Sequence, residues 1–219
     1  MKHITSLLLF FATFATAQDI PEDRILHYDA VVLSLDTALC QCHVISINND
    51  TLAVSFRKAL IFYPELCDLK IRVKYGNINT SMAAQPRILS VFNNRNRRTY
   101  RVIVNKKPQS EQTQLLYAVP FNAQVGIMGH ELAHVLDYSE KSGWQLTWMG
   151  IRYLGKNYRR RLERQTDSVT IDRGLGWQLY DFAYFVENNA VIDEKYRQYK
   201  LDFYMKPEEI LELINRLGE

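Results

Sequence analysis

One change in the spacing of apolar residues, about halfway along the chain, constrains the fold more than any other feature. Before it, short apolar runs alternate with polar residues or contain β-branched residues, which is typical of strands. After it, apolar residues recur at helical spacing up to the C-terminus. The expected helices are 122–138, 144–155, 158–173, 176–188, 190–203 and 207–217. A sheet half followed by a helical half is an α+β arrangement.

The N-terminal half is expected to contain one helix and a small, mostly antiparallel sheet. Residues 50–63 have helical spacing, and residues 69–75 alternate apolar with basic side chains. Two further strand-like runs follow at 87–92 and 100–104. The polar segment 93–96 between them predicts a hairpin loop, which would make these two strands antiparallel neighbours.

The start of the chain has the features of an export signal. Lys2 gives a positive start, residues 4–14 are mostly apolar, and Ala15-Thr16-Ala17 is a small-x-small cleavage site. We therefore expect a signal peptide at 1–17 and an exported protein, periplasmic or secreted. A chain of 219 residues is long enough for one well-buried domain, expected at 18–219. No later stretch reaches eighteen apolar residues, so the mature chain is expected to have no transmembrane segment.

Charge and cysteine content narrow the function classes. A formal net charge of +3 argues against a nucleic-acid partner, and the basic clusters at 95–101 and 159–161 are interpreted as solvated surface. An exported chain can form a disulfide, and three cysteines leave at least one unpaired within the chain. Whether Cys67 pairs with Cys40 or Cys42 is open.

The segment with the clearest chemistry is His130-Glu131-Leu132-Ala133-His134, in the first helix of the C-terminal half. Residues four apart on an α-helix differ by about 40° in direction and about 6 Å along the axis, so both imidazoles can bind one ion. Zinc accepts such nitrogen ligands. Glu131 can lie beside the metal without binding it and act as the general base on a water molecule.

A catalytic zinc site needs a third protein ligand and one open position. Asp137 lies on the same helix as the two His. Its side chain is short, and a third ligand from that helix would crowd the two imidazoles. Glu163 is better placed, because it comes from a separate helix that can close the site from another direction. Asp167, four residues further on, can accept the remaining N–H of a ligand His and fix its tautomer.

These two segments, residues 129–134 and 163–167, resemble the gluzincin pattern HExxH…ExxxD. The chain is similar to the short, mostly helical relatives of the CAAX-protease and HtpX-like metallopeptidases. The resemblance implies a zincin-like domain, with Glu163 as third ligand and Asp167 supporting a ligand His. It also implies a metalloendopeptidase-like hydrolase that cleaves peptide or protein substrates, with Glu131 as general base. It covers about 129–167 well and the rest loosely.

The chain departs from this pattern in two respects. The CAAX-protease relatives have transmembrane helices, whereas this mature chain is expected to have none. Some gluzincins stabilise the oxyanion with a downstream His, and no His follows His134 here. The side chains considered for that role are Tyr180, Tyr184 and Arg173, besides a backbone donor. Tyr184 is the preferred catalytic donor on its spacing after Glu163.

Three further expectations accompany this interpretation. By analogy with gluzincin folds, an extended peptide would pair with the strand at 100–104. The alternative function is a catalytically weak or inactive, metal-stabilised binding or scaffold module of the same fold. Another metal-dependent hydrolase, such as an amidase acting on cell-wall peptides, is also open.

Overall fold

The computed structural model describes residues 20–31, 44–45, 51–78, 80–105, 119–189 and 192–218. The expected signal peptide at 1–17 lies outside these residues, as do Cys40 and Cys42. Cys67 is disulfide-bonded. Among the described residues, no helix has the length and apolar character needed to cross a membrane.

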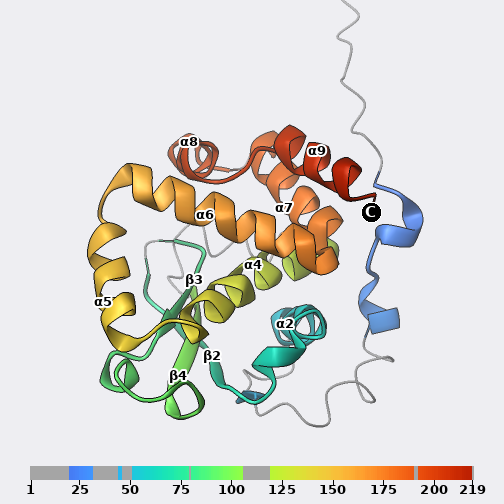
Figure 1. The fold of residues 1–219 in the computed structure, drawn as a ribbon. Helices are drawn as coiled ribbons and strands as arrows, with labels where there is room; N and C mark the ends of the chain where they lie inside the picture. Colours follow the sequence, from blue (N-terminus) through green and yellow to red (C-terminus); the bar gives the residue numbers. More distant parts are fainter. Residues whose placement is uncertain are drawn as a thin grey trace, which may run out of the picture.

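The α+β prediction is confirmed: a small sheet lies in the N-terminal half, and helices form the C-terminal half (Figure 1). The helical elements are η1 (Glu22–Arg24), α2 (Thr51–Leu60), η2 (Pro64–Leu66), η3 (Ile88–Ser90), η4 (Arg95–Arg97), α4 (Phe121–Ser139), α5 (Gly143–Arg152), α6 (Lys156–Thr170), the π-helical turn η5 (Ile171–Leu175), α7 (Gly176–Asn188), α8 (Glu194–Phe203) and α9 (Pro207–Leu217). The strands are β1 (Val44–Ile45), β2 (Lys70–Gly76), β3 (Met82–Pro86) and β4 (Thr99–Asn105).

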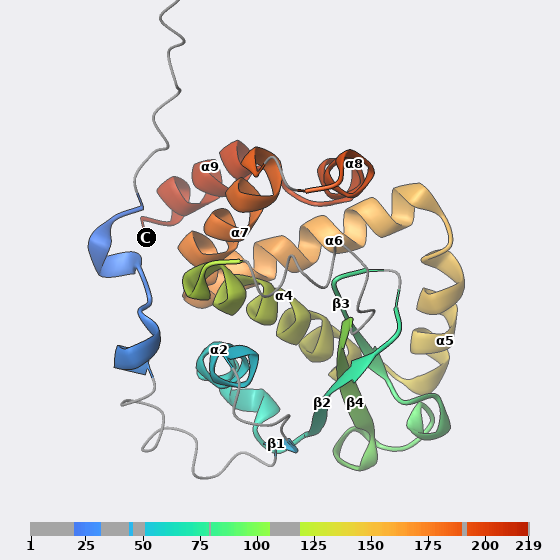
Figure 2. The ribbon, with the colours of Figure 1, turned by 180° about the vertical axis from the view of Figure 1, so that it is seen from behind.

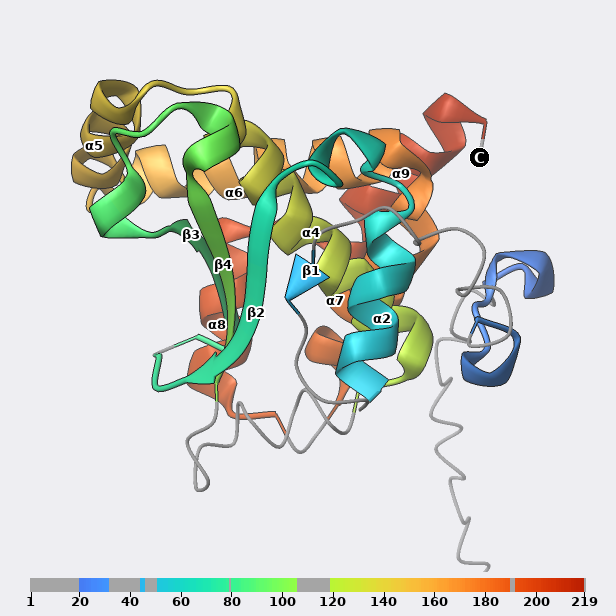
Figure 3. The same cartoon turned by 90° about the horizontal axis from the view of Figure 1, so that it is seen from below.

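The sheet has the order β1-β2-β4-β3, and Figure 3 shows the strands side by side in this order. Its strands are mixed in direction: β1 with β2 and β2 with β4 are parallel, and only β3 with β4 is antiparallel. The expectation of a mostly antiparallel sheet is therefore wrong. Alternation along a strand reports which side chains are buried, but it does not report the direction of a neighbouring strand.

The third strand also lies elsewhere than expected. Residues 82–86 form β3, whereas the predicted strand at 87–92 contains the 3-10 turn η3. Ile88 and Leu89 are exposed, so their apolar character does not reflect a buried strand face. Position 86 is a proline at the end of β3, where a proline is tolerated because β3 is an edge strand.

Helix α4 is the centre of the molecule. Every residue of α4 except Phe121 and Asp137 is buried. It packs against α2, α6, α7 and β3, and Figure 2 shows it between α2 and α6 from behind. The contact with α7 is unusually close, because a Cβ atom at Gly126 would lie 2.2 Å from the carbonyl oxygen of Gln178. Glycine at this position lets the two backbones approach.

Candidate metal centre

Two helices bring three metal-ligating side chains together. His130 and His134 lie on adjacent turns of α4, and Glu163 lies on α6, which crosses α4 (Figure 1). Glu163 Oε2 is 3.2 Å from Nε2 of His130 and 3.2 Å from Nε2 of His134. All three side chains are buried, and their ligand atoms lie within 4.8 Å of one another. The group can hold a metal ion.

A second set of contacts fixes the orientation of both imidazole rings. Asp167 Oδ1 is 2.8 Å from His130 Nδ1, and its other oxygen accepts the backbone N–H of Met205 at 2.8 Å. The hydroxyl of Thr166 donates to the carbonyl of Leu162 at 2.9 Å and lies 3.3 Å from Nδ1 of His134.

Both acceptors favour the tautomer with the proton on Nδ1. Each Nε2 lone pair is then free to bind a metal, which is the usual role of such outer partners. Asp167, expected to support a ligand His, lies against Nδ1 of His130. Thr166 was missed, although its position directly before Asp167 on the same helix was a usable signal.

When no metal ion is bound, the negative charges of Glu163 and Asp167 are balanced by protonation of a histidine. Burial by itself lowers the pKa of His130, but hydrogen bonds and negative charge from Asp167 and Glu163 outweigh it and raise that pKa to about 10. Burial raises the pKa of Glu163, yet His134 and His130 hold it well below its ordinary value. A positive charge is therefore favoured between these side chains, and either a proton or a metal ion supplies it.

Glu131 faces a cleft beside this group. Its side chain is buried, and Oε2 has no hydrogen-bond partner among the described residues. The cleft has a volume of about 610 Å³ and is lined by Glu131, His134 and Glu163 on one side and by all five residues of β3 on the other. A buried carboxylate oxygen without a partner is costly unless a ligand or water uses it.

Four tyrosines not predicted from the sequence surround the ligands, namely Tyr138, Tyr153, Tyr199 and Tyr204, which all line the cleft. The hydroxyl of Tyr153 donates a hydrogen bond to Oε1 of Glu163. The ring of Tyr204 lies 5.4 Å from the ring of His130. Tyr138 lies on α4, four residues after His134, and its ring stacks on that of His134 with the centroids 5.7 Å apart. The other three come from the residue after α5, from α8 and from its C-terminal end, so no local motif connects them to the histidines.

The residues expected to supply the oxyanion donor lie elsewhere. Tyr184 stacks on Tyr180 at 6.0 Å between ring centroids, in the apolar cluster that joins α7 to α9. Arg173 forms an ion pair with Glu65. Neither Tyr184 nor Arg173 lines the cleft. The chain changes direction at η5, where Gly174 has a φ of 83°. Residues 173–184 therefore do not continue the helix axis of α6, and their sequence distance from Glu163 does not place them beside it.

The expectation that a peptide pairs with the strand at 100–104 is also wrong. Strand β4 is hydrogen-bonded to β2 on one side and to β3 on the other, so it has no free edge. The edge strands of the described sheet are β1 and β3, and β3 is the one that lines the cleft.

No protein-family model, curated protein or solved structure matches this chain.

Proposed function

We propose that the protein is an exported, zinc-dependent metallopeptidase of the gluzincin type. The observation that carries the proposal is the meeting of His130, His134 and Glu163 at one point, next to the partner-free carboxylate of Glu131. Two imidazoles and one carboxylate form the ligand set of catalytic zinc sites, which keep a further position for water or substrate.

Two of the ligand-to-ligand distances support a tetrahedral ion such as zinc. Ligands about 2.0–2.1 Å from a tetrahedral ion are separated from each other by about 3.3 Å. Glu163 Oε2 lies 3.2 Å from each histidine Nε2, close to this separation, and all three ligand atoms lie within 4.8 Å of one another. Among the described residues no sulfur ligand joins this group. Its two imidazoles favour zinc over Cu(I), which prefers sulfur ligands, and over Mg²⁺ and Ca²⁺, which prefer oxygen ligands.

Bound zinc would polarise a peptide carbonyl and make a water molecule more acidic. Glu131 then accepts a proton from the attacking water, whose oxygen bonds to the carbonyl carbon. When the C–N bond breaks, Glu131 returns this proton to the departing amine. Its burial and its lack of a hydrogen-bond partner support this role, since nothing else in the described structure competes for Oε2.

Tyr204 replaces Tyr184 as the proposed oxyanion donor. It lines the cleft together with Glu131, and the described residues leave its hydroxyl without a hydrogen bond. Burial first, and then the negative charge of Glu163, raise the pKa of Tyr204 well above its ordinary value, so the hydroxyl keeps its proton. Tyr204→Phe is expected to lower kcat about 10²–10³-fold without changing zinc content.

An extended peptide would pair with the free edge of β3. Ser81 and Arg87 direct their hydrogen bonds toward β4, so alternation turns the N–H and C=O of Ala84 to the cleft. Ala84→Pro removes this outward N–H without breaking a β3–β4 bond. We expect it to raise KM at unchanged zinc content, and an unchanged KM would contradict peptide pairing here.

The decisive test is Glu131→Gln, assayed for zinc by elemental analysis and for hydrolysis with a broad peptide library. We expect zinc near that of the wild type and a loss of hydrolysis of about 10³-fold. Glu140→Gln, an exposed Glu at the end of the same helix, is the matched control and should retain activity. Zinc binding by the wild type without hydrolysis of any peptide would favour the scaffold function.

A further inference from the structure

One end of the molecule carries a broad exposed apolar surface. It is made by α5 and by the η3 region between β3 and β4. We call it the α5 patch and define it as Ile88, Leu89, Phe92, Trp144, Trp148 and Ile151. Trp144 is 76% exposed and Leu89 is 84% exposed. Clustered side chains of this size mark an interaction surface, whereas single exposed apolar residues need no explanation.

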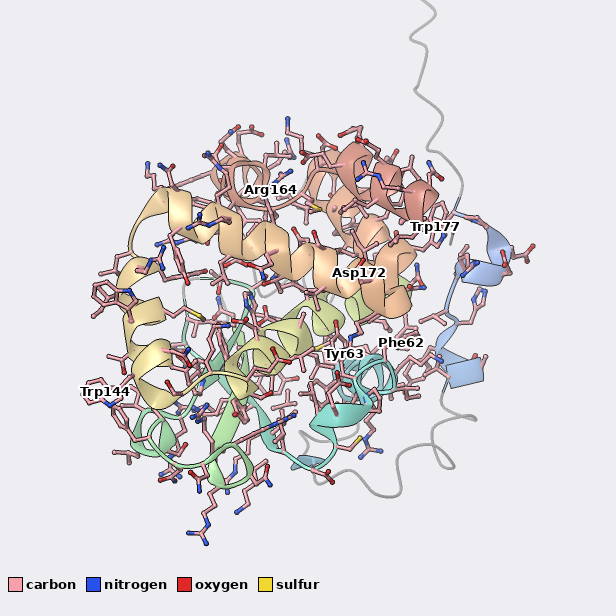
Figure 4. The ribbon with its side chains drawn as sticks, in the orientation of Figure 1. Phe62, Tyr63, Trp144, Arg164, Asp172 and Trp177 are labelled. Atoms are coloured by element: carbon pink, nitrogen blue, oxygen red, sulfur yellow. The ribbon has the colours of Figure 1, made fainter. Side chains whose placement is uncertain are left out.

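The two parts of the α5 patch are packed together. The rings of Phe92 and Trp144 are 5.2 Å apart, edge to face. A Cβ atom at Gly143 would lie 2.6 Å from the Phe92 ring, so α5 begins directly against this segment. Trp148 and Ile151 follow Trp144 at helical spacing on one side of α5. Figure 4 shows Trp144 at the outer margin of the molecule.

The surroundings of the α5 patch are basic. Both stretches of chain that form it lack acidic residues: residues 69–110 and residues 141–162 contain no Asp or Glu. The second stretch contributes Lys141, Arg152, Lys156 and the run 159–161. The neighbouring end of α4 does carry acidic side chains, of which Asp137 is paired with Lys141.

We propose that the α5 patch binds the surface of an anionic phospholipid bilayer. Indole rings favour the boundary between headgroups and acyl chains, and aliphatic side chains favour the acyl region. Flanking Lys and Arg side chains attract anionic headgroups. A nucleic acid would use the basic groups but would gain nothing from Ile88, Leu89 or Ile151. The bilayer is therefore the partner that uses both properties of this surface.

The opposite face of α5 gives this binding a consequence. Leu146 and Met149 are buried and line the cleft beside the metal centre. Helix α5 thus lies between the cleft and the tryptophans of the α5 patch, and Ile88 of the patch itself lines the cleft. The cleft would therefore open close to the lipid surface. The inference itself does not depend on zinc chemistry, because no member of the α5 patch is a ligand or a proposed catalytic group.

The test uses tryptophan fluorescence of the full chain with vesicles of phosphatidylglycerol and phosphatidylcholine, some made with brominated acyl chains. Of the three tryptophans, Trp177 is buried, so quenching by bromine reports Trp144 and Trp148. We expect quenching and a blue shift that high salt weakens and that vesicles of phosphatidylcholine alone do not give. This readout also separates insertion of the α5 patch from any attachment through another segment.

Sedimentation with the same vesicles measures the affinity. Trp144→Ala and Trp148→Ala are each expected to weaken binding about tenfold, with an unchanged circular dichroism spectrum because both side chains are exposed. Leu217→Ala, an exposed apolar residue of α9 at the opposite end of the molecule (Figures 1 and 3), is the control and should bind normally. Absence of quenching, or a chain that instead dimerises or binds duplex DNA through Trp144 and Trp148, would overturn the proposal.

Discussion

Replacement of Asp167 by Asn tests how strongly the hydrogen bond between Asp167 and His130 affects the affinity of the candidate site for zinc. Asp167 is buried and accepts two hydrogen bonds, each at 2.8 Å: one from Nδ1 of His130 and one from the backbone N–H of Met205. An Asn side chain has only one oxygen. If that oxygen faces His130, the amide nitrogen meets the N–H of Met205, and two donors oppose each other.

The reverse orientation is worse for the metal. The amide then donates to Nδ1 of His130, and the proton of the neutral imidazole moves to Nε2, where the metal must bind. Loss of such an outer partner lowers metal affinity about 10–100-fold, which corresponds to about 1.4–2.7 kcal/mol. The first orientation leaves a buried N–H unpaired and costs about 1–3 kcal/mol of folding stability. In the first orientation a neutral amide oxygen also replaces the carboxylate, which makes the His130 ligand less basic, so both orientations predict weaker zinc binding.

Competition with a chromophoric chelator measures this change in affinity. Asp172→Asn, at an exposed position of η5 labelled in Figure 4, makes the same chemical change away from the ligands and should leave the affinity unaltered. Zinc affinity of Asp167→Asn equal to that of the wild type, in a folded protein, would refute the argument that Asp167 fixes the tautomer of His130.

Three other outcomes follow from the structure. Zinc affinity should rise about tenfold per pH unit between neutral pH and pH 9, because the metal-free His130 has a pKa of about 10 and must lose its proton to bind. Calorimetry in buffers of different ionisation enthalpy should show this proton release. Gly126→Ala should lower the free energy of unfolding by about 2–3 kcal/mol, and Tm by about 5–10 °C in thermal melts, since its Cβ meets the backbone of Gln178. Ser142→Ala should lower it by about 1 kcal/mol in denaturant titration, since it breaks the capping box with Gln145 that begins α5.

Features that depend only on neighbouring residues were predicted well from the sequence, and features that depend on distant contacts were not. The helices α4, α7 and α9 lie within a residue of their expected bounds, because a buried stripe at helical spacing needs only its own sequence. Helix α6 ends before its expected limit at 173, because the chain continues through the π-helical turn η5 and turns at Gly174. The strand at 87–92 was wrong because exposed Ile88 and Leu89 imitate a buried strand.

The sequence by itself determined that His130 and His134 lie together, since residues four apart on a helix share a face wherever that helix lies. It also singled out Glu163 and Asp167, through their spacing of four on one further helix and the resemblance to a two-motif pattern. Only the tertiary structure decided which strand is the free edge and which tyrosine approaches the metal centre, because β3 and Tyr204 reach the cleft through packing between distant segments. Such contacts depend on how whole helices and strands pack against one another. This packing leaves no periodic pattern in the sequence.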